Sequence, residues 1–269
     1  MNNREVKRRI ASVKETVKIT RAMYAISVAK MVKAKSALPL TEQFYENALS
    51  VMEKAASSSA PYFAERGSKT AFIVIGSDKG LCGDYNQRVF EKAQEVMRQV
   101  SEKFLFTVGS VTKEMLAKVG LEADVEFLHS AEDPSPESAY SMAEDLLNLY
   151  EEGLLDRVLL VYSKATANHS EPVVKPLLPY IAEQNLPAPQ EGITESAVRK
   201  SVYEYLAGAL YNGLWSSSLS EHIARVKAMM QATKNGEAMI ADLTAKYNKI
   251  RQESITRSLQ DAACSDQGL

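Results

Sequence analysis

The residues with the most suggestive chemistry form a loop at positions 76–86, which contains Gly76, Gly80 and Gly83. The loop follows a short apolar run and precedes a helical pattern, and glycines in such a place can hold a phosphate group on backbone amides. Neither G-x-x-x-x-G-K-[ST] nor G-x-G-x-x-G occurs in it. We therefore interpret the loop as a structural turn in which Gly80 and Gly83 supply unusual backbone angles.

Other residues that could carry chemistry are isolated along the chain. The histidines and cysteines do not show the spacing of a metal site or a catalytic pair. They are His129, His169, His222, Cys82 and Cys264. Glu132 and Asp133 are neighbours in a loop with prolines, and we interpret them as solvated charges. The sequence predicts no catalytic residue, no metal ligand and no cofactor.

The composition is ordinary for a soluble protein, with 45% hydrophobic and 25% charged residues. No apolar run reaches the roughly 20 residues that cross a bilayer, and the first residues do not have the pattern of a secretory or organelle-targeting signal. Two cysteines without ligand spacing fit a reducing compartment, where we expect them to be small buried apolar residues. We expect a soluble, cytoplasmic chain.

The charge is distributed unevenly. Residues 1–40 carry a net charge of +8, residues 41–193 carry −11, and residues 194–269 carry +1. A basic end on an acidic body favours an acidic partner surface, such as a ring of acidic protein loops. A nucleic acid is an alternative partner, although no recognition motif or aromatic platform accompanies the basic residues.

The N-terminal segment predicts a long helix. Residues 4–38 contain no proline or glycine, and Pro39 is the first residue that would break a helix. Apolar and small residues recur there at alternating steps of four and three, the pattern of a coiled-coil seam. The seam is Val6, Ile10, Val13, Val17, Thr20, Tyr24, Ser27, Met31 and Ala34. A second apolar line through Ile19, Met23 and Ile26 indicates a further neighbour, and an acidic helix is expected at 41–56.

The C-terminal segment predicts a still longer helix over residues 194–263. At the rise of an α-helix it would reach about 105 Å. A compact chain of this length would be only about 45 to 50 Å across. Such a helix is expected to project and to need a partner along its side. Its seam is Leu219, Ile223, Val226, Met230 and Thr233, then, after an interruption at Gly236 and Glu237, Ile240, Leu243, Tyr247, Ile250 and Ser254.

The middle of the chain alternates strand and helix patterns, which predicts an α/β domain. Strands are expected at 70–75, 104–108, 125–128, 157–163 and 172–178, and helices at 86–100, 112–118 and 138–150. Prolines place the last strand at an edge of the sheet. The fold class is therefore α/β plus a long antiparallel coiled coil, with a Rossmann-like α/β domain inserted between the N- and C-terminal helices. The expected divisions are 1–56, 70–190 and 194–269.

Three motifs resemble one protein family, the gamma subunits of F-type ATP synthases of bacterial type. They are Lys-Ile-Thr-Arg-Ala-Met at 18–23, Gly-Ser-Asp-Lys-Gly-Leu-Cys-Gly at 76–83 and Tyr-Asn-Lys-Ile-Arg-Gln-Glu-Ser-Ile-Thr at 247–256. They occur in the family's order and the resemblance covers essentially the whole chain. The C-terminal tip departs from the family, because Ser258 stands where an acidic residue is common.

The resemblance implies a non-catalytic rotor. In that family the terminal helices form a shaft inside a ring of three alpha and three beta subunits. The α/β domain sits at the foot with the epsilon subunit, on a membrane ring of c subunits, at the cytoplasmic face of the bacterial membrane. In that family ATP is handled by the surrounding subunits and not by the gamma subunit. A nucleic-acid-binding coiled coil and a nucleotide-binding enzyme built on the middle domain are the alternatives.

The resemblance also implies residues that contact partners. Met23, Arg225, Gln252 and Thr256 stand where family members contact the beta subunit or hold the two shaft helices in register. The other implied contacts are Arg8, Arg9, Lys30 and Lys33 toward acidic loops of the ring, and Tyr205 and Tyr211 toward the epsilon subunit and the c ring.

Overall fold

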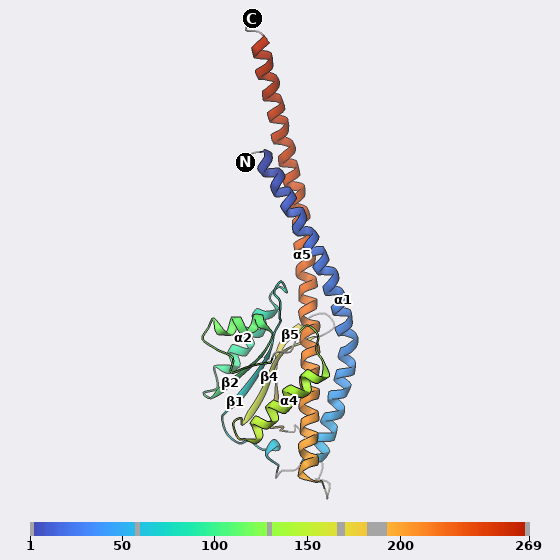
Figure 1. Cartoon of the computed structure of the whole chain (residues 1–269), viewed down its shortest axis with the longest axis vertical. Helices are drawn as coiled ribbons and strands as arrows, with labels where there is room; N and C mark the ends of the chain where they lie inside the picture. The colour runs from blue at the N-terminus through green and yellow to red at the C-terminus, as the bar shows by residue number, and fades with distance from the viewer. Residues whose placement is uncertain (1–2, 57–59, 128–130, 166–169, 182–192, 267–269) are drawn as a thin grey trace. The chain divides into compact units, whose positions relative to one another are not determined.

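A computed structural model describes residues 3–56, 60–127, 131–165, 170–181 and 193–266. Its elements are α1 (Asn3–Ala55), η1 (Pro61–Phe63), β1 (Thr70–Ile75), α2 (Tyr85–Met97), β2 (Lys103–Val108), α3 (Ser110–Ala117), β3 (Val125–Glu126), α4 (Pro136–Glu151), β4 (Arg157–Ala165), β5 (Ser170–Leu178) and α5 (Glu195–Asp266) (Figure 1). The residues fall into two compact units. We call Met1–Ser27 with Val226–Leu269 the helix-pair unit, and Val28–Arg225 the sheet unit.

The sheet unit is built on five strands in the order β3-β2-β1-β4-β5. Strands β3, β2, β1 and β4 run parallel to one another, while β5 pairs antiparallel to β4. All of β1 is buried, as its unbroken apolar run predicts for a central strand. The prediction that the proline-containing strand lies at the edge is confirmed, because β5 ends the sheet.

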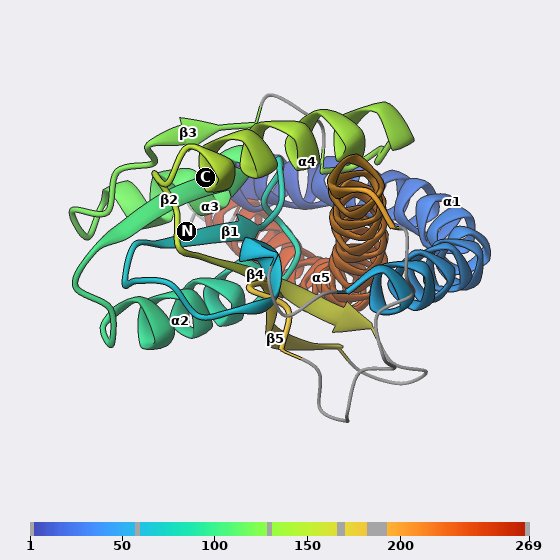
Figure 2. The ribbon, with the colours of Figure 1, turned by 90° about the horizontal axis from the view of Figure 1, so that it is seen from below.

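Side chains alternate between the two faces of the sheet and enter two cores. Ile73, Ile75 and Leu160 pack with α4 and the first part of α5, whereas Phe72 and Val74 pack with α2 and α3. Figure 2 shows α2 and α4 on opposite sides of the sheet. A small third cluster joins α1 to α5 through Ala34, Trp215 and Leu219. The expectation of an α/β domain is confirmed, and helices cover both faces of its sheet.

Helix α1 does not end at Pro39, so the prediction of two separate helices is wrong. One helix runs through Pro39, which is exposed. The buried positions continue past the proline at Thr41, Ala48 and Met52, in step with Ala34. Burial of this continuous stripe offsets the hydrogen bond that proline cannot donate.

In the helix-pair unit the two segments run antiparallel. Thr20 and Thr233 share a hydrogen bond of 2.8 Å between their hydroxyl oxygens, and Arg21 forms an ion pair with Glu237. A Cβ added to Gly236 would lie 2.4 Å from Cγ2 of Val17. The sequence interruption at Gly236 is therefore not a break, because the helix continues through it and the missing side chain lets α1 approach.

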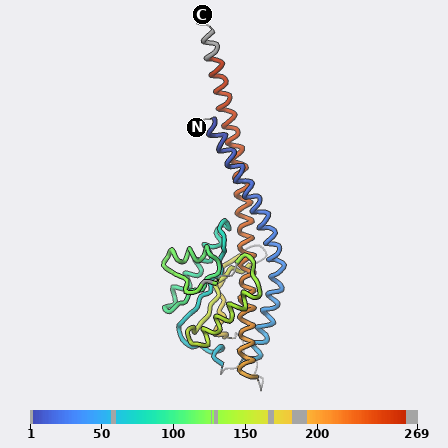
Figure 3. Tube along the Cα trace, in the orientation of Figure 1, coloured from blue at the N-terminus to red at the C-terminus, as the bar shows by residue number. Residues whose placement is uncertain are grey.

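The seam is only partly as expected. Val6, Val17 and Leu243 are buried in the helix-pair unit, as predicted. Tyr24 is 39% exposed and Met230 is 58% exposed, so neither belongs to it, and Met229 is buried instead. An α-helix has 3.6 residues per turn, so a strict seven-residue spacing drifts around its surface. Residues 251–260 are all exposed, and α5 continues past the start of α1 (Figure 3).

Candidate partner-contact sites

The basic residues of α1 have different surroundings. Arg8 and Arg9 are exposed in the helix-pair unit. In the sheet unit, Lys30 Nζ lies 2.7 Å from Oε2 of Glu132, and Lys33 Nζ lies 2.6 Å from Oδ1 of Asp133. An acidic loop of the same chain therefore already faces these two lysines.

Glu132 is not a solvated loop charge, and that expectation is wrong. Its side chain is 13% exposed, and Lys79 Nζ lies 2.9 Å from the same oxygen that Lys30 binds. Burial would raise the pKa of Glu132, but hydrogen bonds from Lys30 and Lys79 outweigh it and lower the pKa to about 2. Glu132 thus joins α1 to the loop after β1. Asp133, at 69% side-chain exposure, is solvated as expected.

Arg225 faces inward, and its contacts lie within the sheet unit. Its side chain is 5% exposed, and Nη2 lies 2.5 Å from Oε1 of Glu221, one helical turn earlier. The same Nη2 donates to the backbone carbonyls of Lys79 at 2.9 Å and Gly80 at 3.2 Å. Arg225 thus holds the loop after β1, and these contacts favour an internal role over a direct contact with a partner.

Two titratable groups beside Arg225 are perturbed by their surroundings. Burial raises the pKa of Glu221, and Arg225 opposes that effect. His222 has Nδ1 3.2 Å from Nη1 of Arg225, and burial together with this charge lowers the pKa of His222 to about 4. The imidazole is therefore neutral at neutral pH. Within the described residues Nε2 of His222 and Oε2 of Glu221 have no hydrogen-bond partner.

The loop between β1 and α2 is a structural turn, as the absent phosphate motifs predict. The N–H of Ser77 donates to Oδ1 of Asn86 at 3.1 Å, so this amide is occupied within the chain. Gly83 has a φ of 62°, as expected, but the other left-handed residue is Leu81, with a φ of 63°, and not Gly80. The contacts of Arg225 to the carbonyls at 79 and 80 help to hold Leu81 in this uncommon conformation.

Three other predicted contact residues lie in the helix-pair unit. Met23 is half-buried, whereas Gln252 and Thr256 are exposed. The hydroxyl of Thr256 donates to the backbone carbonyl of Gln252 at 3.0 Å, a bond within one helix. The outer faces of these two residues are accessible on the bare part of α5.

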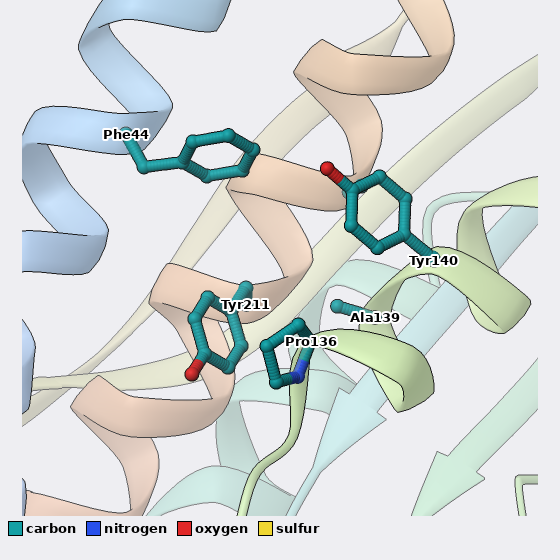
Figure 4. A pocket seen from close by; sticks show the side chains of 6 residues that line it. Phe44, Pro136, Ala139, Tyr140 and Tyr211 are labelled. Carbon is teal, nitrogen blue, oxygen red and sulfur yellow. The ribbon is translucent and has the colours of Figure 1, made fainter.

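The two tyrosines differ. Tyr205 is 1% exposed, with its ring 5.8 Å from that of Tyr45 and 5.7 Å from that of Tyr180. Its burial favours a packing role. Tyr211 is half-buried and lines an apolar cavity of about 170 Å³ between α1, α4 and α5. Figure 4 shows Phe44, Pro136 and Tyr140 around the same cavity, which Ala139 and Ala207 complete.

Sequence reasoning missed several residues that organise the sheet unit. The spacing of Glu221 and Arg225, four residues apart on a helix, is a signal that could have found that pair. Nothing local marks Glu132 as a bridge between two lysines, since its partners lie more than fifty residues away. The described residues hold no group of three or more His, Cys, Asp or Glu that could bind a metal ion. No helix in the described ranges is long and apolar enough to cross a membrane.

Comparison with known proteins points in one direction. A sequence model of the family described as ATP synthase matches residues 2–264. The chain is 36% identical to the ATP synthase gamma chain of Pelotomaculum thermopropionicum, with 96% of this chain and 95% of that protein covered. It is 33% identical to the ATP synthase gamma chain of Caldanaerobacter subterraneus, with 96% and 97% covered.

Solved structures show the same fold. The chain superposes on a chain of the Euglena gracilis mitochondrial ATP synthase, in a structure containing OSCP, F1 and the c-ring, with a TM-score of 0.79 and 18% identity. That match covers 99% of this chain and 94% of the other. A second match, with a TM-score of 0.73 and 17% identity, is to a chain in the rotor of the same enzyme and covers 94% and 98%.

Proposed function

Because the chain belongs to the ATP synthase gamma-chain family, we propose that it forms the central stalk of an F-type ATP synthase. In this role it couples rotation of a membrane-embedded c ring to ATP synthesis or hydrolysis in a surrounding ring of alpha and beta subunits. The chain is a non-catalytic subunit. The observation that carries the proposal is the family match over residues 2–264, together with relatives named ATP synthase gamma chain over 96% of the chain.

We propose that the antiparallel segments of the helix-pair unit form a coiled-coil shaft. The buried side chains of Val6, Val17 and Leu243 support this, as does the close approach at Gly236. The strand order, with β1 between β2 and β4, supports a Rossmann-like domain between the terminal helices. The corresponding functional parts are residues 1–56, 70–190 and 194–269.

We assign the partners by position. The exposed residues Arg8, Arg9, Gln252 and Thr256 and the half-buried Met23 are proposed contacts with the alpha and beta subunits. Tyr211, beside its apolar cavity, is a proposed contact for the epsilon subunit or the c ring. Lys30 and Lys33 would meet acidic loops of the ring only in competition with Glu132 and Asp133. We propose that the complex lies at the cytoplasmic face of a bacterial membrane.

Nucleic-acid binding is not favoured. The relatives support the rotor instead, and two of the basic residues that suggested a nucleic acid are paired with carboxylates of the chain.

Affinity purification of the tagged chain from its native cells tests the proposal. We expect alpha and beta subunits to co-purify, each in molar excess over the tagged chain. Recovery of the chain without them, from membranes that contain an active ATP synthase, would contradict the proposal.

A further inference from the structure

A run of serines on α5 lies against the end of β4. Ser216, Ser217 and Ser220 are at most 3% exposed, and Ser218, in the same turn, is equally buried. One turn earlier, a Cβ added to Gly213 would lie 2.9 Å from Cδ2 of Leu160 on β4. Small residues therefore bring this face of α5 unusually close to the strand.

The backbone of β4 needs hydrogen-bond partners at this place. The last residue of β4 that pairs with β1 is Val161, opposite Val74, whereas β4 continues to Ala165 beside β5. Along a strand, alternate residues direct their N–H and C=O groups to opposite sides. The groups of Ser163 and Ala165 on the side of β1 thus extend beyond the reach of that strand.

The serine hydroxyls take the place of the missing strand. The N–H of Ala165 donates to Oγ of Ser216 at 3.0 Å, and the N–H of Ser163 donates to Oγ of Ser217 at 3.3 Å. The hydroxyls of Ser216 and Ser220 both donate to the carbonyl of Ser163 at 3.1 Å. We call these four hydrogen bonds the serine seam.

The seam has a mechanical property that apolar packing lacks. Apolar contacts are not directional, so they define the position of a helix along and about its axis less sharply than hydrogen bonds do. Hydrogen bonds require a narrow range of distance and angle. Because the seam is buried, water cannot replace a bond that a small displacement of α5 along or about its axis would break.

From these observations we infer that Ser216, Ser217 and Ser220 are positioning residues, which fix α5 to the sheet so that torque passes between the α/β domain and the long helix. The inference rests on the proposed rotor function. The seam is buried within the sheet unit. It acts by limiting the slip of α5 against β4.

The test uses the complete ATP synthase in sealed vesicles, carrying the Ser216→Ala/Ser220→Ala double variant. Ser218→Ala is the matched control, because Ser218 is equally buried on the same turn and makes none of the four bonds. The measured quantities are ions pumped per ATP hydrolysed, the ATPase rate, and hydrogen exchange of the Ala165 amide.

We expect the Ala165 amide of the double variant to exchange about tenfold faster, as for the loss of one buried hydrogen bond. The ratio of ions pumped to ATP hydrolysed should fall on the order of twofold, because apolar contacts of α5 are retained. The ATPase rate should change little, and the control should behave as the wild type. A purely stabilising role would instead reduce the amount of assembled complex at an unchanged pumping ratio.

An unchanged ratio in an assembled double variant, or an equal fall in the Ser218→Ala control, would overturn the inference. If the double variant does not assemble, the single variants are measured, since each leaves one hydroxyl donor on the Ser163 carbonyl. A Ser216→Ala variant that pumps normally although its Ala165 amide exchanges faster would also overturn it, because Ser216 accepts that N–H. Failure of the wild-type chain to co-purify with alpha and beta subunits would reject the proposed function itself.

Discussion

At the scale of single residues, the sheet unit depends on charges that are placed far apart in the sequence. Glu132 binds Lys30 and Lys79 through one carboxylate oxygen, at 2.7 and 2.9 Å. Asp133, its neighbour, forms an ion pair with Lys33 in which both side chains are more than 60% exposed. Adjacent carboxylates thus differ in burial and in the number of their partners, and we expect them to differ in their contribution to stability.

We predict that Glu132→Gln lowers the free energy of unfolding by about 1 to 2 kcal/mol near neutral pH. This is less than the full pKa shift would imply, because both lysines are partly exposed and water screens their charges. The pKa of Glu132 is lowered from 4.5 to about 2 in the folded chain. Its contribution is therefore fully present above pH 4.5 and is lost as the pH falls toward 2. Urea unfolding of both proteins at several pH values measures the difference.

Asp133→Asn is the control, because an exposed ion pair contributes little. The difference between wild type and Glu132→Gln should shrink with acidification. A difference that stays constant down to pH 2, or one that the Asp133→Asn variant reproduces, would show that the charge of Glu132 is not the cause.

At the scale of elements, the long helices tolerate residues that usually end or weaken a helix. Pro39 lies inside α1 and Gly236 lies inside α5. The two residues have opposite effects on stability. Pro39 is exposed and destabilises its helix, whereas Gly236 leaves the space that Val17 occupies. The same contrast leads to two predictions of opposite sign.

We predict that Pro39→Ala stabilises the chain. An interior proline costs a helix about 3 kcal/mol, which the substitution removes. Alanine also gives the unfolded chain more conformational freedom, which offsets part of this gain. We expect the free energy of unfolding to rise by about 1 to 2 kcal/mol. Urea unfolding measures it. A decrease would mean that the packing of Ala34 and Thr41 needs the local geometry that the proline imposes.

We predict that Gly236→Ala destabilises the helix pair, although alanine has the higher helix propensity by about 1 kcal/mol. The new Cβ would lie 2.4 Å from Val17, whose branched side chain has little freedom to move. Thermal unfolding should show a lower midpoint for Gly236→Ala and a partial recovery when Val17→Ala is added. A higher midpoint for the single variant would reject a close contact at this site.

The positions of most helices and strands could be predicted from the sequence, because the spacing of apolar residues follows the repeat of a helix or a strand. The pattern predicts each of the five strands among the described residues, the C-terminal helix and the first part of α1, and the prolines of β5 place it at the edge. Pro39 predicts the end of a helix, but burial of side chains along α1 outweighs this local signal. Arg225 was marked only by resemblance, and the serine seam was not foreseen, because its partners are backbone groups of a strand more than fifty residues away.

At the scale of the whole molecule, a long stretch of α5 is bare of its own chain. Residues 251–260 are all exposed, including Leu259 at 65% and Ile255 at 48%. Apolar side chains on an unaccompanied helix favour contact with other subunits. This stretch contains Gln252 and Thr256, two of the proposed contacts with the surrounding ring.

We predict that deleting residues 259–269 leaves folding and assembly of the complex largely intact. The described side chains next to this segment make no buried contacts within the chain, so little packing is lost. A native gel of membranes from cells that express the truncated chain measures assembly. Absence of the complex there, with normal amounts of the truncated chain in the cell, would show that the last residues are needed for assembly.

Trp215 is the single tryptophan of the sequence. It is 5% exposed and lies in the cluster that joins α1 to α5. Its Nε1 has no hydrogen-bond partner within the described residues. An indole in such dry surroundings emits at short wavelengths, and wetting shifts its emission to the red. Selective excitation of the isolated chain therefore gives an optical signal from one location, where Lys33 lies 5.7 Å above the ring. Stopped-flow fluorescence can use it, without any added dye, to time when the two long helices part.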